Sequence, residues 1–317
     1  MVKLDFSVEL DYEVIQPTEF EFILHASRTS QQTVLRDHFA VWPDIPTNLE
    51  TCSFLGNQHV RLHAEPGPLK IQYSALVEIR HYLAHPSQLE EVSLARLPLD
   101  ILHYLHPSRY CPSDRLYSLA AQQFGNLPKG YARVQAICDW VRNRTRFQPG
   151  TTNSYNCAMD TLNSQVGVCR DFAHLMISLC RALNIPARYV TSIDYGANPA
   201  LGPMDFHAYV EVYLSGRWYI FDPTGISMST GLVRLATGRD ANDVAFATMF
   251  GSAAWSMPRV SMVAVENPAD VIIAPATTDL AISTSDFPQM PMLDAAPAGY
   301  PFVPIHHTEH EWRSANR

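Results

Sequence analysis

The sequence has no apolar run that approaches the length needed to span a bilayer, so we expect no transmembrane helix and no membrane partner. It also lacks an apolar segment of the signal-peptide type near its start, where residues 1–10 alternate as in a strand. We therefore expect a cytoplasmic protein. No glycine-rich phosphate loop followed by a helix is present, so nucleotide binding has no support and we predict no cofactor.

Cysteine pairs at redox or metal spacing are also missing. The six cysteines are widely spread and form no C-x-x-C pair: Cys52, Cys111, Cys138, Cys157, Cys169 and Cys180. This spread is typical of reduced thiols rather than of a disulfide framework. The chain lacks the ligand spacing of a zinc site, so we predict no metal.

Clustered positive charge is the third absence. The chain carries 31 acidic and 23 basic residues and a formal net charge of −8. A general nucleic-acid surface needs clustered Lys and Arg, so this balance argues against a nucleic-acid partner. Hydrophobic residues make up 47% and charged residues 17% of the 317 residues, a normal globular balance in a chain long enough for two domains.

The segment 166–174 carries the strongest chemical signal. Within it, Cys169 precedes apolar residues at steps of three and four, which predict a helix with one buried face. These residues are Phe172, Leu175, Met176, Leu179 and Leu183. Cys169 is therefore predicted at or near the helix N-terminus. Unpaired backbone N–H groups and the helix dipole favour a thiolate there and could stabilise an oxyanion.

Two strands are predicted further along, at 206–214 and 217–222, joined by the hairpin signal Ser215-Gly216. If this dipeptide is the two-residue turn, His207 and Asp222 become diagonal neighbours on one face. They would then lie roughly 7–8 Å apart before their side chains extend. The opposite face holds residues that suit a core: Phe206, Ala208, Val210, Val212 and Leu214.

These three residues suggest thiol chemistry. Cys169 would be the nucleophile, His207 the base and later the acid, and Asp222 the carboxylate that fixes the imidazole tautomer. A lone cysteine at a helix start is more often a small buried hydrophobe, and a lone strand histidine is more often a satisfied polar residue. The helix start, the hairpin geometry and the chain order Cys, His, Asp together favour catalysis.

Neighbouring residues are expected to play supporting parts. Asp171 and His174 lie away from the Cys169 face of the helix, and we interpret them as buried polar residues that satisfy nearby loops. Arg170 is expected to pair with an acid. The loop 147–157 could line a cleft, and one of its side chains could supply a second oxyanion donor. The candidates are Gln148, Asn153 and Tyr155, and the sequence does not choose among them.

Composition and turn signals divide the chain into three parts. Short strands with turn punctuation predict a small sandwich-like all-β domain over residues 1–97. The predicted core covers 98–267, with a candidate rim or lid at 195–205 and a last strand at 259–265 that closes its sheet. From 268 to 317 the composition shifts to Ala, Pro, Thr and Asp, which predicts a tail that is flexible or pinned on the surface.

These motifs resemble the core of the transglutaminase-like superfamily, and more narrowly its bacterial branch of transglutaminase-like cysteine proteases. The matching segments are Gly-Val-Cys-Arg-Asp-Phe-Ala-His174, Asn-Ile-Pro-Ala-Arg-Tyr-Val190, Phe-His-Ala-Tyr-Val-Glu-Val212 and Trp-Tyr-Ile-Phe-Asp-Pro-Thr224. The earlier segments resemble the β domain commonly fused to bacterial members. The resemblance implies an α+β fold, with a papain/transglutaminase-like core whose cysteine-bearing helix packs on an antiparallel sheet. It also implies a papain-like triad of Cys169, His207 and Asp222.

The predicted reaction is attack of the thiol on an amide carbonyl of a peptide or protein substrate, through an acyl-cysteine. Water as the acceptor gives a protease or amidase, and an amine gives a transglutaminase. The three residues serve both outcomes, and the bacterial resemblance favours hydrolysis. The alternative from another class is a catalytically idle module that holds peptides in the cleft. The oligomeric state is not predicted.

Overall fold

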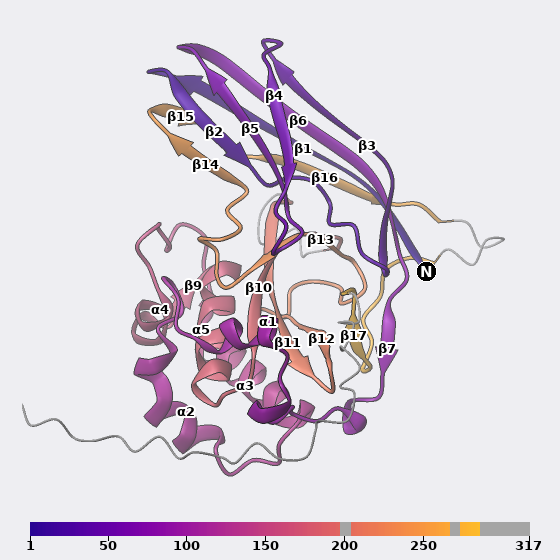
Figure 1. Cartoon of the computed structure of the whole chain (residues 1–317), viewed down its shortest axis with the longest axis vertical. Helices are drawn as coiled ribbons and strands as arrows, with labels where there is room; N and C mark the ends of the chain where they lie inside the picture. The colour runs from indigo at the N-terminus through magenta and orange to yellow at the C-terminus, as the bar shows by residue number, and fades with distance from the viewer. Residues whose placement is uncertain (197–203, 267–272, 286–317) are drawn as a thin grey trace, which may run out of the picture.

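The computed structural model of the chain describes residues 1–196, 204–266 and 273–285. Figure 1 shows two parts: twisted β-strands above, and helices packed on a separate sheet below. This is the predicted α+β arrangement, with an all-β region joined to a helix-on-sheet core. Within the described ranges, no helix is both long enough and apolar enough to cross a membrane.

Two antiparallel sheets form the upper part. Their strands are β1 (Val2–Val14), β2 (Thr18–Phe22), β3 (Gln32–Trp42), β4 (Thr47–Thr51), β5 (Gln58–Ala64), β6 (Gly67–Ile79), β14 (Ala247–Phe250), β15 (Ala253–Trp255) and β16 (Arg259–Ala264). One sheet has the order β15-β1-β6-β3, with β16 also on β1, and the other has the order β14-β2-β5-β4. Every second residue of β1 and β6 is buried, so one face of each strand packs into an apolar core.

Three of these strands come from late in the chain and correct one expectation. We expected the strand at 259–265 to close the core sheet, but β16 pairs with β1, from Leu4↔Ala264 to Glu9↔Arg259. Strand β15 also pairs with β1, and β14 pairs with β2. Alternating residues identify a strand but not its partner. The outer edge of β1 offers a row of backbone groups that β15 and β16 satisfy.

A four-stranded antiparallel sheet and five α-helices form most of the described lower part, together with a short parallel pair, β8 (Arg146–Phe147) and β9 (Val166–Gly167). The strands are β10 (Ala187–Asp194), β11 (Phe206–Leu214), β12 (Arg217–Phe221) and β13 (Leu232–Gly238), and the helices are α1 (Leu99–Leu102), α2 (Tyr117–Phe124), α3 (Tyr131–Arg144), α4 (Ala158–Ser164) and α5 (Cys169–Ala182). The sheet order is β12-β11-β10-β13. Helix α5 packs on β10 and β11, where Ala208, Val210 and Val212 join its apolar cluster as predicted. Phe206, expected in the same set, packs in the upper core instead.

The described part of the C-terminal region lies against the core sheet. Strand β17 (Ala281–Ser283) pairs with β7 (Tyr82–Ala84) and contacts β12. Thr284 and Ser285 are buried as well. The tail that we expected from residue 268 is therefore packed into the molecule over 281–285. Residues 286–317 lie outside the described part of the chain.

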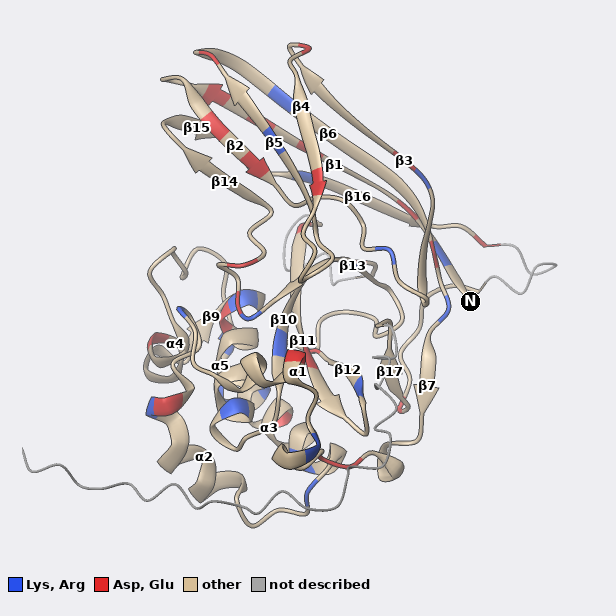
Figure 2. Ribbon diagram, viewed as in Figure 1, with Lys and Arg blue, Asp and Glu red and all other residues tan. Residues whose placement is uncertain are grey.

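A buried ionic cluster holds this segment to the sheet. Glu211 on β11 is fully buried and pairs with Arg188 on β10, with 2.7 Å from Nε to Oε2, and with Arg234 on β13 at 3.3 Å. Figure 2 shows the basic position on β10 beside the acidic position on β11. Both arginines also donate to the Ser285 hydroxyl, at 2.8 and 2.6 Å. Burial alone would raise the pKa of Glu211, but the two arginines lower it, so the carboxylate stays charged.

Removing this carboxylate should destabilise the fold strongly. In Glu211→Ala, two buried guanidinium groups lose their counter-charge, so we expect the free energy of unfolding to fall by about 3–5 kcal/mol. Urea denaturation at pH 7 measures the change. The matched control is Glu13→Ala on β1, where the side chain is exposed and the change should stay within about 0.5 kcal/mol. Equal effects in the two variants would contradict a structural role for the cluster.

Candidate active site

Cys169 is the first residue of α5 and is partly buried, as the sequence predicted. The helix begins here because the Asp171 carboxylate accepts a hydrogen bond from the Val168 N–H at 2.9 Å. Gly167 allows this close turn, since a Cβ at that position would lie only 2.6 Å from the Cβ of Asp171. The thiol therefore sits at the positive end of the helix dipole.

The hairpin that carries the other two residues has the predicted register. Leu214 pairs with Arg217, and the turn residues 215–216 have φ values of 47° and 83°, as a type I′ turn requires. His207 is the second residue of β11, and Asp222 directly follows the last residue of β12. Their reactive atoms are close: His207 Nε2 lies 3.4 Å from Asp222 Oδ1.

The Asp222 carboxylate is held by the turn that follows it. Its Oδ1 accepts hydrogen bonds from the N–H and the hydroxyl of Thr224, at 2.9 and 2.6 Å. Burial alone would raise the pKa of Asp222, but the charge of His207 and the Thr224 hydrogen bonds lower it to about 2. Asp222 is therefore ionised at neutral pH and can stabilise a positive imidazole.

His207 is buried and interacts with both partners. Burial alone would lower its pKa, but the charge of Asp222 and the contact with the Cys169 thiol raise the pKa well above 6.5. His207 Nε2 lies at ion-pair distance from Asp222 Oδ1 but makes no aligned hydrogen bond with it. The contact is therefore electrostatic. The structure thus brings the three predicted residues together around an imidazole that favours its protonated form.

Two further residues of this cluster were not predicted. Asp194, the last residue of β10, is buried, and its Oδ2 lies 4.0 Å from His207 Nδ1. Ser227 donates its hydroxyl to the same Oδ2 at 2.7 Å. Asp194 was visible in the sequence only as a polar residue at the end of a predicted strand. Its closeness to His207 depends on the pairing of β10 with β11, which we did not predict.

The other polar residues of α5 serve the surrounding loops, as predicted for Asp171 and His174. The Thr152 hydroxyl donates to Asp171 at 3.0 Å, and His174 Nε2 accepts from the Ala241 N–H at 3.2 Å. Arg170 departs from its expectation. We expected an acid as its partner, but its guanidinium donates to the Thr152 hydroxyl at 2.6 Å.

The loop 147–157 lies beside the start of α5 and contains the three oxyanion candidates. The Gln148 N–H donates to the Gly167 carbonyl at 2.9 Å, two residues before Cys169. Tyr155 is 85% exposed, and the Asn153 amide oxygen accepts from the Tyr155 N–H at 2.8 Å. Of the three, Gln148 has the most direct backbone contact with the segment before Cys169, and the choice of donor stays a prediction.

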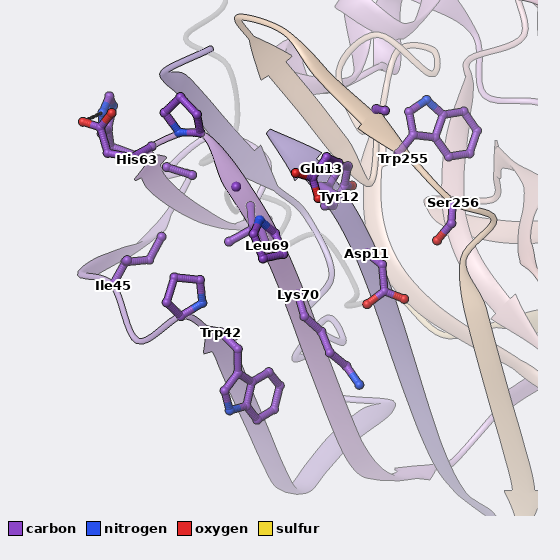
Figure 3. Close-up of a pocket in the computed structure, with 17 residues that line it drawn as sticks. Asp11, Tyr12, Glu13, Trp42, Ile45, His63, Leu69, Lys70, Trp255 and Ser256 are labelled. Atoms are coloured by element: carbon purple, nitrogen blue, oxygen red, sulfur yellow. Dashed lines mark hydrogen bonds and ion pairs between the residues drawn. The ribbon is translucent and has the colours of Figure 1, made fainter. Parts of the chain in front are cut away.

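One well-defined cavity lies away from this chemistry. It measures 840 Å³ and opens between the ends of the N-terminal strands, with Trp42 and Trp255 on opposite sides (Figure 3).

Within the described ranges, no group of three or more His, Cys, Asp or Glu side chains is placed to hold a metal ion. Of the loop 195–205, expected as a rim or lid, residues 197–203 lie outside the described part of the chain.

Two family models match the chain. The model described as the transglutaminase-like superfamily matches residues 117–223, which include all three predicted site residues. The model described as the N-terminal domain of bacterial transglutaminase matches residues 2–100. The matched ranges correspond to most of the core, with helix α5, and to most of the upper sheets.

Three similar proteins can be compared with the chain. The solved structure of a candidate cysteine protease from Cytophaga hutchinsonii is 39% identical, with a TM-score of 0.83, and the match covers 89% of this chain and 97% of that chain. An uncharacterised protein of Mycobacterium leprae is 29% identical over 146 residues, 44% of this chain, and the match spans about half of that relative, 52%. The periplasmic domain of TgpA from Pseudomonas aeruginosa is a distant match, 17% identical with a TM-score of 0.35, covering 70% of this chain and 87% of that chain.

The depressed pKa of Asp222 predicts an acid-dependent loss of stability. Its folded pKa is about 2 and an unfolded Asp has a pKa of about 3.9, so the contribution is present above pH 4 and is lost as the pH falls toward 2. We expect the difference in unfolding free energy between wild type and Asp222→Asn to shrink by about 2 kcal/mol from pH 6 to pH 2. Urea unfolding across this range measures it. A difference that does not change with pH would contradict the charge interaction.

Proposed function

This chain belongs to the transglutaminase-like superfamily, and we propose that it is a thiol enzyme that acts on amide bonds of peptides or proteins. One observation carries the proposal. Cys169 begins a helix and contacts an imidazole, His207, that Asp222 faces at 3.4 Å. We assign Cys169 as the nucleophile, His207 as the acid and base, and Asp222 as the group that stabilises the imidazolium.

The first half-reaction forms the acyl-cysteine. The Cys169 thiolate attacks the amide carbonyl carbon, and the carbonyl electrons move to oxygen as the C–S bond forms. The N-terminus of α5 lies at the thiol and favours this negative charge. The C–N bond then breaks as the intermediate collapses, and the imidazolium of His207 gives its proton to the departing amine.

The second half-reaction releases the acyl group. Water or an amine attacks the acyl-cysteine carbonyl and gives a proton to the now neutral His207. The C–S bond breaks, and the thiolate and the imidazolium are restored. The charge of Asp222 stabilises His207 in its protonated form at the beginning and at the end of the cycle.

Hydrolysis is the outcome that we favour. Its support is the 39% identity, over most of both chains, to a candidate cysteine protease. Amine transfer to protein glutamine is the second candidate, and the N-terminal match to bacterial transglutaminases supports it. An idle peptide-binding module is disfavoured because a protonated imidazole beside a helix-terminal thiol has no use in passive binding.

All six cysteines are free, which fits the cytoplasmic location that we propose.

The assignment predicts that one thiol reacts selectively. Cys111 and Cys138 are buried, and burial raises the pKa of each to about 12, so neither should react near pH 6. We expect iodoacetamide at pH 6 to alkylate Cys169 at least about tenfold faster than any other cysteine. Peptide mapping by mass spectrometry measures each rate. His207→Gln should abolish the preference, and equal labelling of Cys52 and Cys169 in wild type would favour the idle module.

A second experiment separates the two acceptors. Wild type and Cys169→Ala are incubated with a glutamine-containing peptide library, with and without a primary amine, and the products are read by mass spectrometry. We expect backbone cleavage or loss of ammonia without the amine, and a loss of at least about 1000-fold in Cys169→Ala. A mass gain on glutamine that requires the amine would instead establish a transglutaminase. Full activity in Cys169→Ala would refute the nucleophile assignment.

A further inference from the structure

Asp194 lies beside the ring nitrogen of His207 that Asp222 does not face. Its Oδ2 is 4.0 Å from His207 Nδ1, whereas Asp222 Oδ1 is 3.4 Å from Nε2. The Asp194 side chain is buried, so water screens its charge poorly. The imidazole therefore has one carboxylate near each of its two nitrogens, and the mechanism above uses only one of them.

Ser227 fixes both carboxylates. Its hydroxyl donates to Asp194 Oδ2 at 2.7 Å, and its backbone N–H donates to Asp222 Oδ2 at 3.4 Å. One residue of the turn after β12 thus connects the end of β10 to the end of β12. His207 is held from the same side, because the Ser192 hydroxyl on β10 donates to the His207 carbonyl at 3.0 Å.

The position of Asp194 matters because of the nitrogen that it faces. With Nε2 facing Asp222, Nδ1 is the atom left to exchange a proton with the Cys169 thiol and with the leaving amine. At 4.0 Å, Asp194 is too far to hydrogen-bond Nδ1 and so does not compete for that proton. It is close enough for its charge to favour the imidazolium.

We propose that Asp194 is a positioning residue, whose carboxylate, fixed by Ser227, keeps His207 protonated with Nδ1 available to Cys169. The proposal rests on the proposed function for its role in the reaction. Its physical content, a carboxylate that stabilises the charged ring, can be tested without a substrate.

Three titratable groups of the described residues lie against His207: Asp194 at the end of β10, Cys169 at the start of α5 and Asp222 after β12. Asp205 precedes β11, two residues before His207 in the chain. Asp205 itself hydrogen-bonds the Phe206 N–H at 2.7 Å and provides a nearby carboxylate for comparison.

The test is an NMR titration of His207 in the Cys169→Ala background, where the thiol that contacts the imidazole is absent. The ¹³Cε1 shift of the ring reports the pKa of His207 directly. Loss of a negative charge makes the imidazolium give up its proton at lower pH, so adding Asp194→Asn should lower this pKa by about one unit or more. Asparagine has nearly the same size and can still accept the Ser227 hydrogen bond. Asp205→Asn, the matched control, should lower it by under about half a unit.

The outcomes separate this proposal from the proposed function. An unchanged His207 pKa in Asp194→Asn, or an equal fall in Asp205→Asn, overturns the role of Asp194 whatever the enzyme acts on. Should Asp194→Asn not fold, Ser227→Ala serves as the second variant. This variant removes the hydrogen bond that fixes the Asp194 carboxylate, which can then turn away from His207. We expect a smaller fall in the His207 pKa, and no fall overturns the proposal.

A second readout excludes a merely structural effect. With Cys169 present, Asp194→Asn should move the alkaline limb of the pH profile of Cys169 alkylation to lower pH by the same amount as the NMR shift. A structural defect would lower the rate at every pH and leave the limb in place, which would overturn the proposal. A His207 shift in a protein that has no amide-directed activity would keep Asp194 as a positioning residue and refute the proposed function alone.

Discussion

The pairing of β11 with β12 across a two-residue turn determines where the reactive groups lie. Side chains alternate along a strand, so a slip of one residue would move His207 to the other face and away from Asp222. Two left-handed turn residues, Ser215 and Gly216, prevent that slip because they permit only a tight connection. The same register places the neighbouring apolar residues under α5, and the first residue of that helix, Cys169, contacts the imidazole.

Both faces of the core sheet are covered, which makes it a firm support for the site. Helix α5 packs on one face by burial of apolar side chains. The segment 281–285 is held by the apolar contacts of Ile282 and by the charges and hydrogen bonds of the Glu211 cluster. A site of this kind needs supports that do not shift by more than a fraction of an ångström. Here the strands supply the imidazole and the carboxylates, and the short turn after β12 sets the distances between them.

Local signals in the sequence were sufficient for the helix and the hairpin. The apolar period of α5 and the Ser215-Gly216 turn are each contained within a few residues, so His207, Asp222 and Cys169 could be placed without a structure. Asp194 could not, because its proximity to His207 depends on how β10 pairs with β11 and on where the turn delivers Ser227. Strand β16 could pair with any open strand edge, and the sequence does not say which one. The sequence around Ser285 has few large apolar residues, so its composition gives no sign that Ser285 is buried among arginines.

The upper sheets are assembled from strands at residues 2–79 and at residues 247–264, and this sets an order of events during synthesis. Glu9 and Arg259 meet in adjacent strands although 250 residues separate them. At typical translation rates, roughly 12–50 s pass between the emergence of β1 and that of β16 from the ribosome. During that interval helix α5 and its sheet can already form, while β1 presents an open edge to other chains. The upper sheets are therefore begun before the core and completed after it, and a chaperone would have to cover the open edge of β1 in the meantime.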